Sequence, residues 1–203
     1  MKRFLKPFLL ILCFLSLTAC HSLPNIDAQN KEGIYPYELS EREAELLQAF
    51  GMSGNSLVLS FHAPQEATSL IVNTYTLNES HQWVGSAGGG LYLSEDRKPS
   101  EVLAGLFTIQ LQDDFMIEYN ITCGGRSKFT TPPIYLPATI SSSSRAFLQD
   151  FQEIKLNREI PIAMMIYDSG TTMRSYSMDD FFEPSNFADM DLVQVVTLIF
   201  TDE

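Results

Sequence analysis

Apolar and polar residues alternate through most of the chain after position 54, and this pattern constrains the fold more than any other. In one example, Leu57, Leu59 and Phe61 occupy every second position. Successive side chains of a β-strand point to opposite faces, so this spacing predicts strands with one buried and one solvated face. The apolar face of such a sheet needs a second layer to cover it, which favours two packed sheets.

The clearest pair of strands lies between positions 103 and 123. Apolar residues share one parity on each side of the polar turn: Leu103, Phe107, Ile109 and Leu111 before it, and Phe115, Ile117, Tyr119, Ile121 and Cys123 after it. Opposed residues point to the same face, so the two apolar faces match only across an odd loop. We therefore expect a three-residue loop at 112–114, with Leu111 opposite Phe115. A two-residue turn at 113–114 would place Ile109 opposite Glu118.

Further strands are predicted at 57–62, 69–77, around Trp83, at 91–93, at 160–167 and at 192–200. The glycine run 88–90 is predicted to interrupt the sheet as a turn or bulge. The segment 192–200 is apolar on both parities apart from Gln194 and Thr197, which predicts a central strand covered on both faces.

Helical spacing is confined to short segments. A capping box at Ser40 to Glu43 precedes apolar residues at 46, 47 and 50, so we expect a helix over 40–50 whose apolar stripe packs on the domain. A short helix over 144–151 and one helical turn at 177–180 are also predicted. The segment 124–133 is predicted to be an exposed loop, because its adjacent prolines cannot continue a central strand.

These elements predict a mainly β fold. We expect an antiparallel β-sandwich with one N-terminal helix, and a partly closed β-barrel is the alternative. A parallel α/β fold is disfavoured because few helical segments separate the strands. No second domain boundary is found, so residues 39–203 are predicted to form a single β-rich globular domain.

The first twenty residues have the organisation of a signal peptide. Basic residues precede an apolar run over 8–17 of about ten residues, which is shorter than the ~20 that a spanning helix needs. The tetrapeptide Leu17 to Cys20 resembles the lipobox of bacterial lipoproteins. This resemblance covers residues 1–20 only, and it implies that residues 1–19 are a cleaved signal peptide and that Cys20 receives a diacylglycerol. A plain secretory signal and an uncleaved anchor are the alternatives.

A lipid on Cys20 would place the protein at the cell membrane, on its extracytoplasmic face. Two acyl chains anchor a protein stably, whereas one chain holds it only marginally. Residues 20–38 are polar and rich in turn formers, including Pro24 and Pro36, and are predicted to be a tether. A flexible tether of this length spans roughly 20–25 Å.

Net charge restricts the partners. Without the three basic residues of the signal segment, 10 basic and 25 acidic side chains leave a net charge of −15. Nucleic acid is excluded because phosphate binding needs a basic surface, and anionic lipids and cell-wall polymers are disfavoured for the same reason. Basic proteins and cations stay open as partners, together with an unknown small molecule.

The sequence contains none of the common catalytic or phosphate-binding motifs, and we predict no cofactor and no metal. Acid pairs such as Asp113-Asp114 lack the ligand number of a calcium loop. His81, beside Trp83, is the one histidine in a suggestive place, and a hydrolase would need a carboxylate partner for it. Cys123 has the parity of the core, so we expect a buried structural thiol rather than a catalytic one.

Aromatic residues give the main indication of a binding surface. With a three-residue loop at 78–80, Tyr75 would lie across from Trp83, and Tyr92 would follow beyond the glycine run. Flat rings of this kind stack on ligands in binding modules, although they also fill sandwich cores. We therefore take Tyr75, Trp83 and Tyr92 as candidate binding residues and expect core packing to be the stronger role of Trp83.

Together these features indicate a membrane-anchored extracytoplasmic domain that binds a ligand or partner. A hydrolase that uses His81 is one alternative, and a structural lipoprotein of the cell envelope is another. A histidine–carboxylate pair in a cleft would favour the hydrolase, a concave aromatic cleft would favour a small ligand, and a large exposed apolar patch would favour the structural class.

Overall fold

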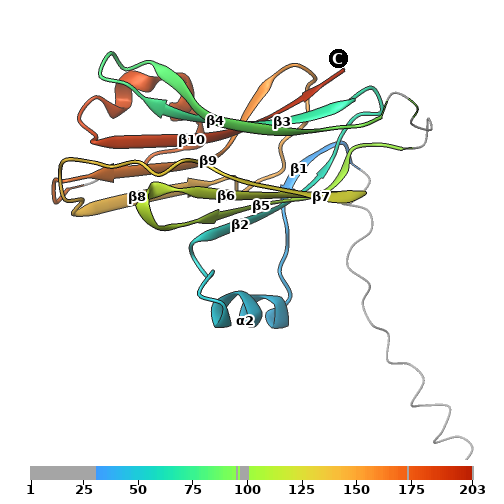
Figure 1. The fold of residues 1–203 in the computed structure, drawn as a ribbon, viewed down its shortest axis with the longest axis horizontal. Helices are drawn as coiled ribbons and strands as arrows, with labels where there is room; N and C mark the ends of the chain where they lie inside the picture. The colour runs from blue at the N-terminus through green and yellow to red at the C-terminus, as the bar shows by residue number, and fades with distance from the viewer. Residues whose placement is uncertain (1–30, 95, 97–100, 173, 203) are drawn as a thin grey trace, which may run out of the picture. The chain divides into compact units, whose positions relative to one another are not determined.

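The computed structural model describes residues 31–94, 96, 101–172 and 174–202. Cys20, the signal segment and most of the predicted tether lie outside these residues. The segment from Glu32 to the C-terminus forms one compact unit. Within the described part of the chain, ten strands form two antiparallel five-stranded sheets, and one α-helix and short 3₁₀ turns lie in the connections between strands (Figure 1).

The first sheet, sheet A, has the strand order β1-β2-β5-β6-β7. Its strands are β1 (Gly33–Pro36), β2 (Ser56–His62), β5 (Ala104–Leu111), β6 (Ile117–Cys123) and β7 (Gly125–Thr130). The second, sheet B, has the order β4-β3-β10-β9-β8. Its strands are β4 (Trp83–Tyr92), β3 (Ser69–Leu77), β10 (Leu192–Thr201), β9 (Glu159–Asp168) and β8 (Ser142–Phe147).

The main core lies between the two sheets. The alternating residues Leu57, Leu59 and Phe61 are buried in it, as the sequence predicts. Tyr119 of sheet A is fully buried there, and its hydroxyl forms a hydrogen bond with the Thr74 hydroxyl of sheet B. The predicted β-sandwich is therefore confirmed, and the sheets do not close into the alternative barrel.

The hairpin of β5 and β6 has the predicted faces and a different register. Leu111 pairs with Ile117, so the loop has five residues, 112–116, and Phe115 lies outside the strand. The Phe115 ring packs against Tyr167 with a centroid distance of 4.7 Å, and its carbonyl accepts a hydrogen bond of 3.0 Å from Gln194. These contacts with sheet B thus stabilise the five-residue loop. The predicted apolar faces are still correct, because the predicted three-residue loop and the observed five-residue loop both have an odd number of residues.

The predicted interruption at the glycine run is wrong, because residues 88–90 pair with β3 inside β4. Gly89 lies directly beneath the Phe129 ring of β7, on the opposite sheet. A Cβ atom on Gly89 would lie 2.8 Å from the Cζ atom of Phe129. The absence of a side chain at this position therefore makes room for a ring from the other layer.

Two further predictions are corrected by the edge strands. The segment 125–130, predicted to be a loop, forms β7 after a reversal at Gly124, whose φ is 62°. The segment 142–147 forms β8 and not the start of a helix, with Ser144 opposite Ile166 of β9. β7 pairs with the preceding strand β6, and β8 pairs with the following strand β9. In both cases these backbone hydrogen bonds outweigh the local sequence preference.

The outer face of sheet B is also covered. The 3₁₀ turns η3 (Met178–Phe182) and η4 (Pro184–Phe187) insert Phe181 and Phe187 against Met164, Ile166 and β10. Strand β10 is consequently buried on both faces, as predicted for 192–200. The helical turn predicted at 177–180 is also present as η3, with a capping box between Ser177 and Asp180.

The N-terminal boundary and Cys123 differ from the predictions. Residues 33–36, expected in the tether, form β1, and Ile34 exchanges two backbone hydrogen bonds of 2.8 Å with Gln152. The domain therefore begins before residue 39. Cys123 packs against the core and is half-buried rather than fully buried, because it occupies the last position of β6.

The predicted helix is present as α2 (Glu41–Ala49), with Ser40 as its N-cap. Its predicted packing on the domain is wrong, because none of its residues is buried. Figure 1 shows α2 apart from the two sheets, in the connection between β1 and β2. No helix in the described ranges has the length and apolar character needed to cross a membrane.

Candidate binding groove at the free edge of β8

The structure brings two of the three candidate aromatic residues together. Trp83 pairs with Leu77, so the loop of this hairpin has five residues, and Tyr75 lies opposite Gly85. Both Tyr75 and Trp83 contact Phe181, with ring-centroid distances of 6.1 and 5.5 Å. Tyr92 lies at the other end of β4, opposite Ser69, and is 68% exposed. The three rings therefore do not form a single platform.

Trp83 serves to hold the 3₁₀ turns on sheet B. Its ring stacks on Phe181 and is tilted against Phe187, and its Nε1 atom donates a hydrogen bond of 2.8 Å to the Phe181 carbonyl. Burial is also the main reason that the pKa of Tyr75 is raised to about 12. Packing within the protein thus occupies the surfaces that a stacked ligand would use.

The capping box of η3 depends on the charge of Asp180. Asp180 accepts hydrogen bonds from the Ser177 backbone at 2.6 Å, from the Asn186 side chain at 2.7 Å and from the Ser177 hydroxyl at 3.1 Å. These bonds, that of the Ser177 backbone first, hold the pKa of Asp180 below its usual range. The ionised carboxylate therefore stabilises η3.

Acidification is expected to loosen η3 from sheet B. An aspartate in an unfolded chain titrates near pH 3.9, so the lowered pKa of Asp180 contributes stability above about pH 4. That contribution is lost as the pH falls through the folded-state pKa. Trp83 is the only tryptophan, so its fluorescence reports the change. Asp180→Asn should shift the Trp83 emission already at neutral pH. It should also remove the part of the acid transition that comes from protonation of Asp180. Asp179→Asn should have neither effect. Identical acid profiles for wild type and Asp180→Asn would contradict this assignment.

His81 lies at the surface, in the turn between β3 and β4. Its φ is 55°, its backbone N–H donates to the Asn78 carbonyl, and its side chain is exposed. Within the described residues, the His81 ring makes no hydrogen bond to a carboxylate, and no group of three or more histidine, cysteine, aspartate or glutamate side chains could hold a metal ion. The geometry that a hydrolase would require at His81 is not found there.

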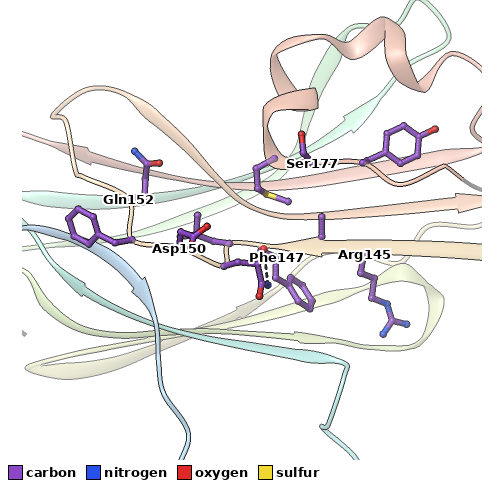
Figure 2. Close-up of a pocket in the computed structure, with 11 residues that line it drawn as sticks. Arg145, Phe147, Asp150, Gln152 and Ser177 are labelled. Carbon is purple, nitrogen blue, oxygen red and sulfur yellow. Dashed lines mark hydrogen bonds between the residues drawn. The ribbon is translucent and has the colours of Figure 1, made fainter. Parts of the chain in front are cut away.

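An open groove of about 550 Å³ runs beside β8, the edge strand of sheet B (Figure 2). One wall is the chain from Arg145 to Gln152, and the other is the segment from Tyr176 to Met178, which leads into η3. The volume lies within the range of about 300–1,000 Å³ typical of ligand sites. The groove is thus large enough to hold a ligand or a peptide segment.

The backbone of β8 is unpaired along this edge. Leu148 donates to the Ile162 carbonyl, and in an antiparallel ladder alternate residues turn their backbone groups toward the partner. The intervening residues Arg145 and Phe147 therefore turn theirs away from β9. The Gln149 Nε2 atom donates a hydrogen bond of 3.0 Å to the Phe147 carbonyl. An exposed side chain thus occupies a position that a further strand would take.

The groove combines apolar and polar side chains. Phe147, Leu148 and Met178 supply the apolar surface, and Asp150 supplies an exposed carboxylate. Arg145 is turned toward sheet A, where its Nη1 atom donates to the Gly54 carbonyl at 2.9 Å and to the Asn55 side chain. The Arg145 guanidinium at the end of the groove is therefore already hydrogen-bonded within the domain. The charge that remains available in the groove is the negative charge of Asp150.

A second, smaller hollow of about 280 Å³ lies on the other side of Arg145. The loop 112–115, Asn55 and Tyr167 line it. Asp113 and Asp114 make its rim acidic.

Sequence reasoning missed the groove because it predicted a helix over 144–151. The sequence signal for this strand is weak. Ser141 begins a serine-rich segment, and no local pattern shows that β9 will pair with it. Comparisons with protein-family models, with curated proteins and with solved structures find no match for this chain. The function therefore has to be inferred from the site and from the sequence of this chain.

Proposed function

We propose that this protein is a lipid-anchored, extracytoplasmic interaction domain that binds an extended peptide segment in the groove beside β8. The observation that carries the proposal is the unpaired edge of β8 facing an open groove. An extended peptide can add to such an edge as a further strand, with main-chain hydrogen bonds giving affinity and side-chain pockets giving specificity.

The lipobox-like sequence supports the location. A lipid on Cys20 would hold the domain at the membrane surface and raise its local concentration there, outside the cytoplasm. A binding domain requires only an adapted surface on a stable scaffold, which the sandwich supplies. The hydrolase alternative would require a base and an acid in contact, and His81 has no such partner in the described residues.

The charge of the domain indicates the kind of peptide. The net charge of −15 expected after signal cleavage attracts basic segments, and the exposed Asp150 carboxylate lies inside the groove. Phe147 and Met178 supply apolar contacts for alternate side chains of a strand. The best ligand is therefore an extended segment that combines apolar and basic residues.

The groove is tested with peptides selected from a random display library against the chain from residue 21. We expect the selected peptides to be apolar and basic. Asp150→Lys should weaken their binding at least about tenfold, which corresponds to 1.4 kcal/mol. Glu153→Lys, a charge reversal outside the groove lining, should have little effect in isothermal titration calorimetry.

Strand addition itself is tested by N-methylation of a selected peptide. Methyl groups on the amides that face β8 should abolish binding, whereas methyl groups on the alternate amides should leave it intact. Equal tolerance of both series, or binding that is indifferent to Asp150→Lys, would show that the peptide does not add to β8.

A further inference from the structure

Helix α2, in the connection between β1 and β2, presents a second surface separate from the groove. Its N-terminus is closed by a complete capping box, in which the Ser40 backbone donates to Glu43 at 2.7 Å and the Glu43 backbone donates to the Ser40 hydroxyl at 3.4 Å. Its C-cap is Phe50, which is followed by Gly51 with a φ of 70°. The backbone N–H of Met52 donates to the Leu47 carbonyl at 2.8 Å, as in a Schellman motif.

The base of the helix is attached to sheet A. The Tyr37 backbone donates to the Val58 carbonyl at 2.9 Å, and the Ser56 hydroxyl donates to the Met52 carbonyl at 2.8 Å. The Tyr37 hydroxyl also donates to the Glu43 carboxylate at 3.1 Å. These contacts fix both ends of the connection, so the helix is held in place without being packed on the domain (Figure 1).

Large apolar side chains on and beside this helix point into solvent. Leu46 is 57% exposed and Phe50 is 74% exposed, and they lie four residues apart on one face. Leu39, just before the cap, is 41% exposed. A nine-residue helix is marginally stable by itself in water, and these three side chains contribute little to the folding of the domain. Their exposure is explained if something else covers them.

The charges around the apolar face restrict what can cover it. Glutamates at 38, 41, 43 and 45 surround a single cation, Arg42. Helices that lie on membranes carry basic polar faces, so an anionic lipid surface is disfavoured. A second copy of this acidic chain is disfavoured by the same repulsion. The complementary surface is one with an apolar groove bordered by lysine or arginine.

We propose that α2 docks into an apolar groove with a basic rim on a partner protein, with Leu46 and Phe50 as the inserted side chains. Recognition of an amphipathic helix by a groove is a common mode of protein association. Buried aromatic and aliphatic anchors supply most of the affinity, and the flanking charges supply steering and specificity. This contact uses a different surface from the β8 groove and does not depend on it.

The proposal is tested by placing a photo-crosslinking amino acid at single positions of the full chain in its native host. At position 46 we expect a discrete protein adduct whose crosslinked peptide, mapped by mass spectrometry, is flanked by lysine or arginine. At position 48, on the opposite face, we expect none. The double variant Glu41→Lys/Glu45→Lys should reduce the adduct at least fivefold, and Asp150→Lys in the β8 groove should leave it unchanged.

A matched stability measurement separates docking from a structural role. The double variant Leu46→Gln/Phe50→Gln should melt at the wild-type temperature, because both side chains are exposed in the free domain. An adduct with lipid or with a second copy, equal adducts at 46 and 48, or no adduct would overturn the proposal. A large loss of thermal stability in the double variant would also overturn it.

Discussion

Cys20→Ala is expected to release the protein from the membrane. The lipid attached at this position would supply two acyl chains, and each buried CH₂ group contributes about 0.8 kcal/mol to membrane binding. Loss of the cysteine should therefore move most of the protein into the soluble fraction or block processing of the precursor. Fractionation of cell membranes and labelling with a fatty-acid analogue measure the two effects.

Cys13 supplies the matched control for this experiment. It lies seven residues earlier, within the apolar run and outside the lipobox-like tetrapeptide. Cys13→Ala should therefore leave membrane retention and lipid labelling as they are in wild type. Full retention and labelling of the Cys20→Ala protein would refute the anchor and, with it, the membrane location in the proposed function.

Trp83→Ala is expected to destabilise the domain by about 3 kcal/mol, at the lower end of the range for removing a large aromatic side chain, because Trp83 is only partly buried. The substitution removes ring contacts with Phe181 and Phe187 and the hydrogen bond to the Phe181 carbonyl. Urea unfolding followed by circular dichroism gives the change in free energy.

Trp83→Phe separates packing from hydrogen bonding at the same position. It keeps an aromatic ring against Phe181 and loses the Nε1 donor, so a cost of about 1 kcal/mol is expected. A Trp83→Ala protein with an unchanged unfolding midpoint would contradict the packing role. It would also restore the interpretation of Trp83 as an exposed binding residue.

Several features of the fold follow from local sequence. Alternation at 57–61 and on both sides of the 112–116 loop predicts strands with one buried face, because the period of side chains in a strand is two. The capping box at Ser40 and the helical turn at 177–180 are correctly predicted, because both depend on residues close together in the chain. The central position of 192–200 follows from its apolar residues on both faces.

The arrangement of the candidate site residues is predicted less well from the sequence. Tyr75 and Trp83 share a face, as parity requires, but the five-residue turn moves them out of direct opposition and places Phe181 on both. Phe181 comes from about one hundred residues later in the chain, so no local pattern connects it with Trp83. Tyr92 lies in the same strand as Trp83, but the two residues are at opposite ends of β4.

The sequence alone determined that the chain forms strands with one apolar face, that a capped helix follows Ser40 and that a helical turn follows Ser177. Tertiary structure decided the hairpin registers, the edge strands β7 and β8, and the exposure of α2. The register of β5 and β6 depends on Phe115 contacting Tyr167, and the glycine run depends on Phe129 of the opposite sheet. β7 forms because the chain reverses at Gly124 and pairs with β6, and β8 forms because it pairs with β9. The spacing of side chains does not show which backbone groups a neighbouring strand will leave unpaired.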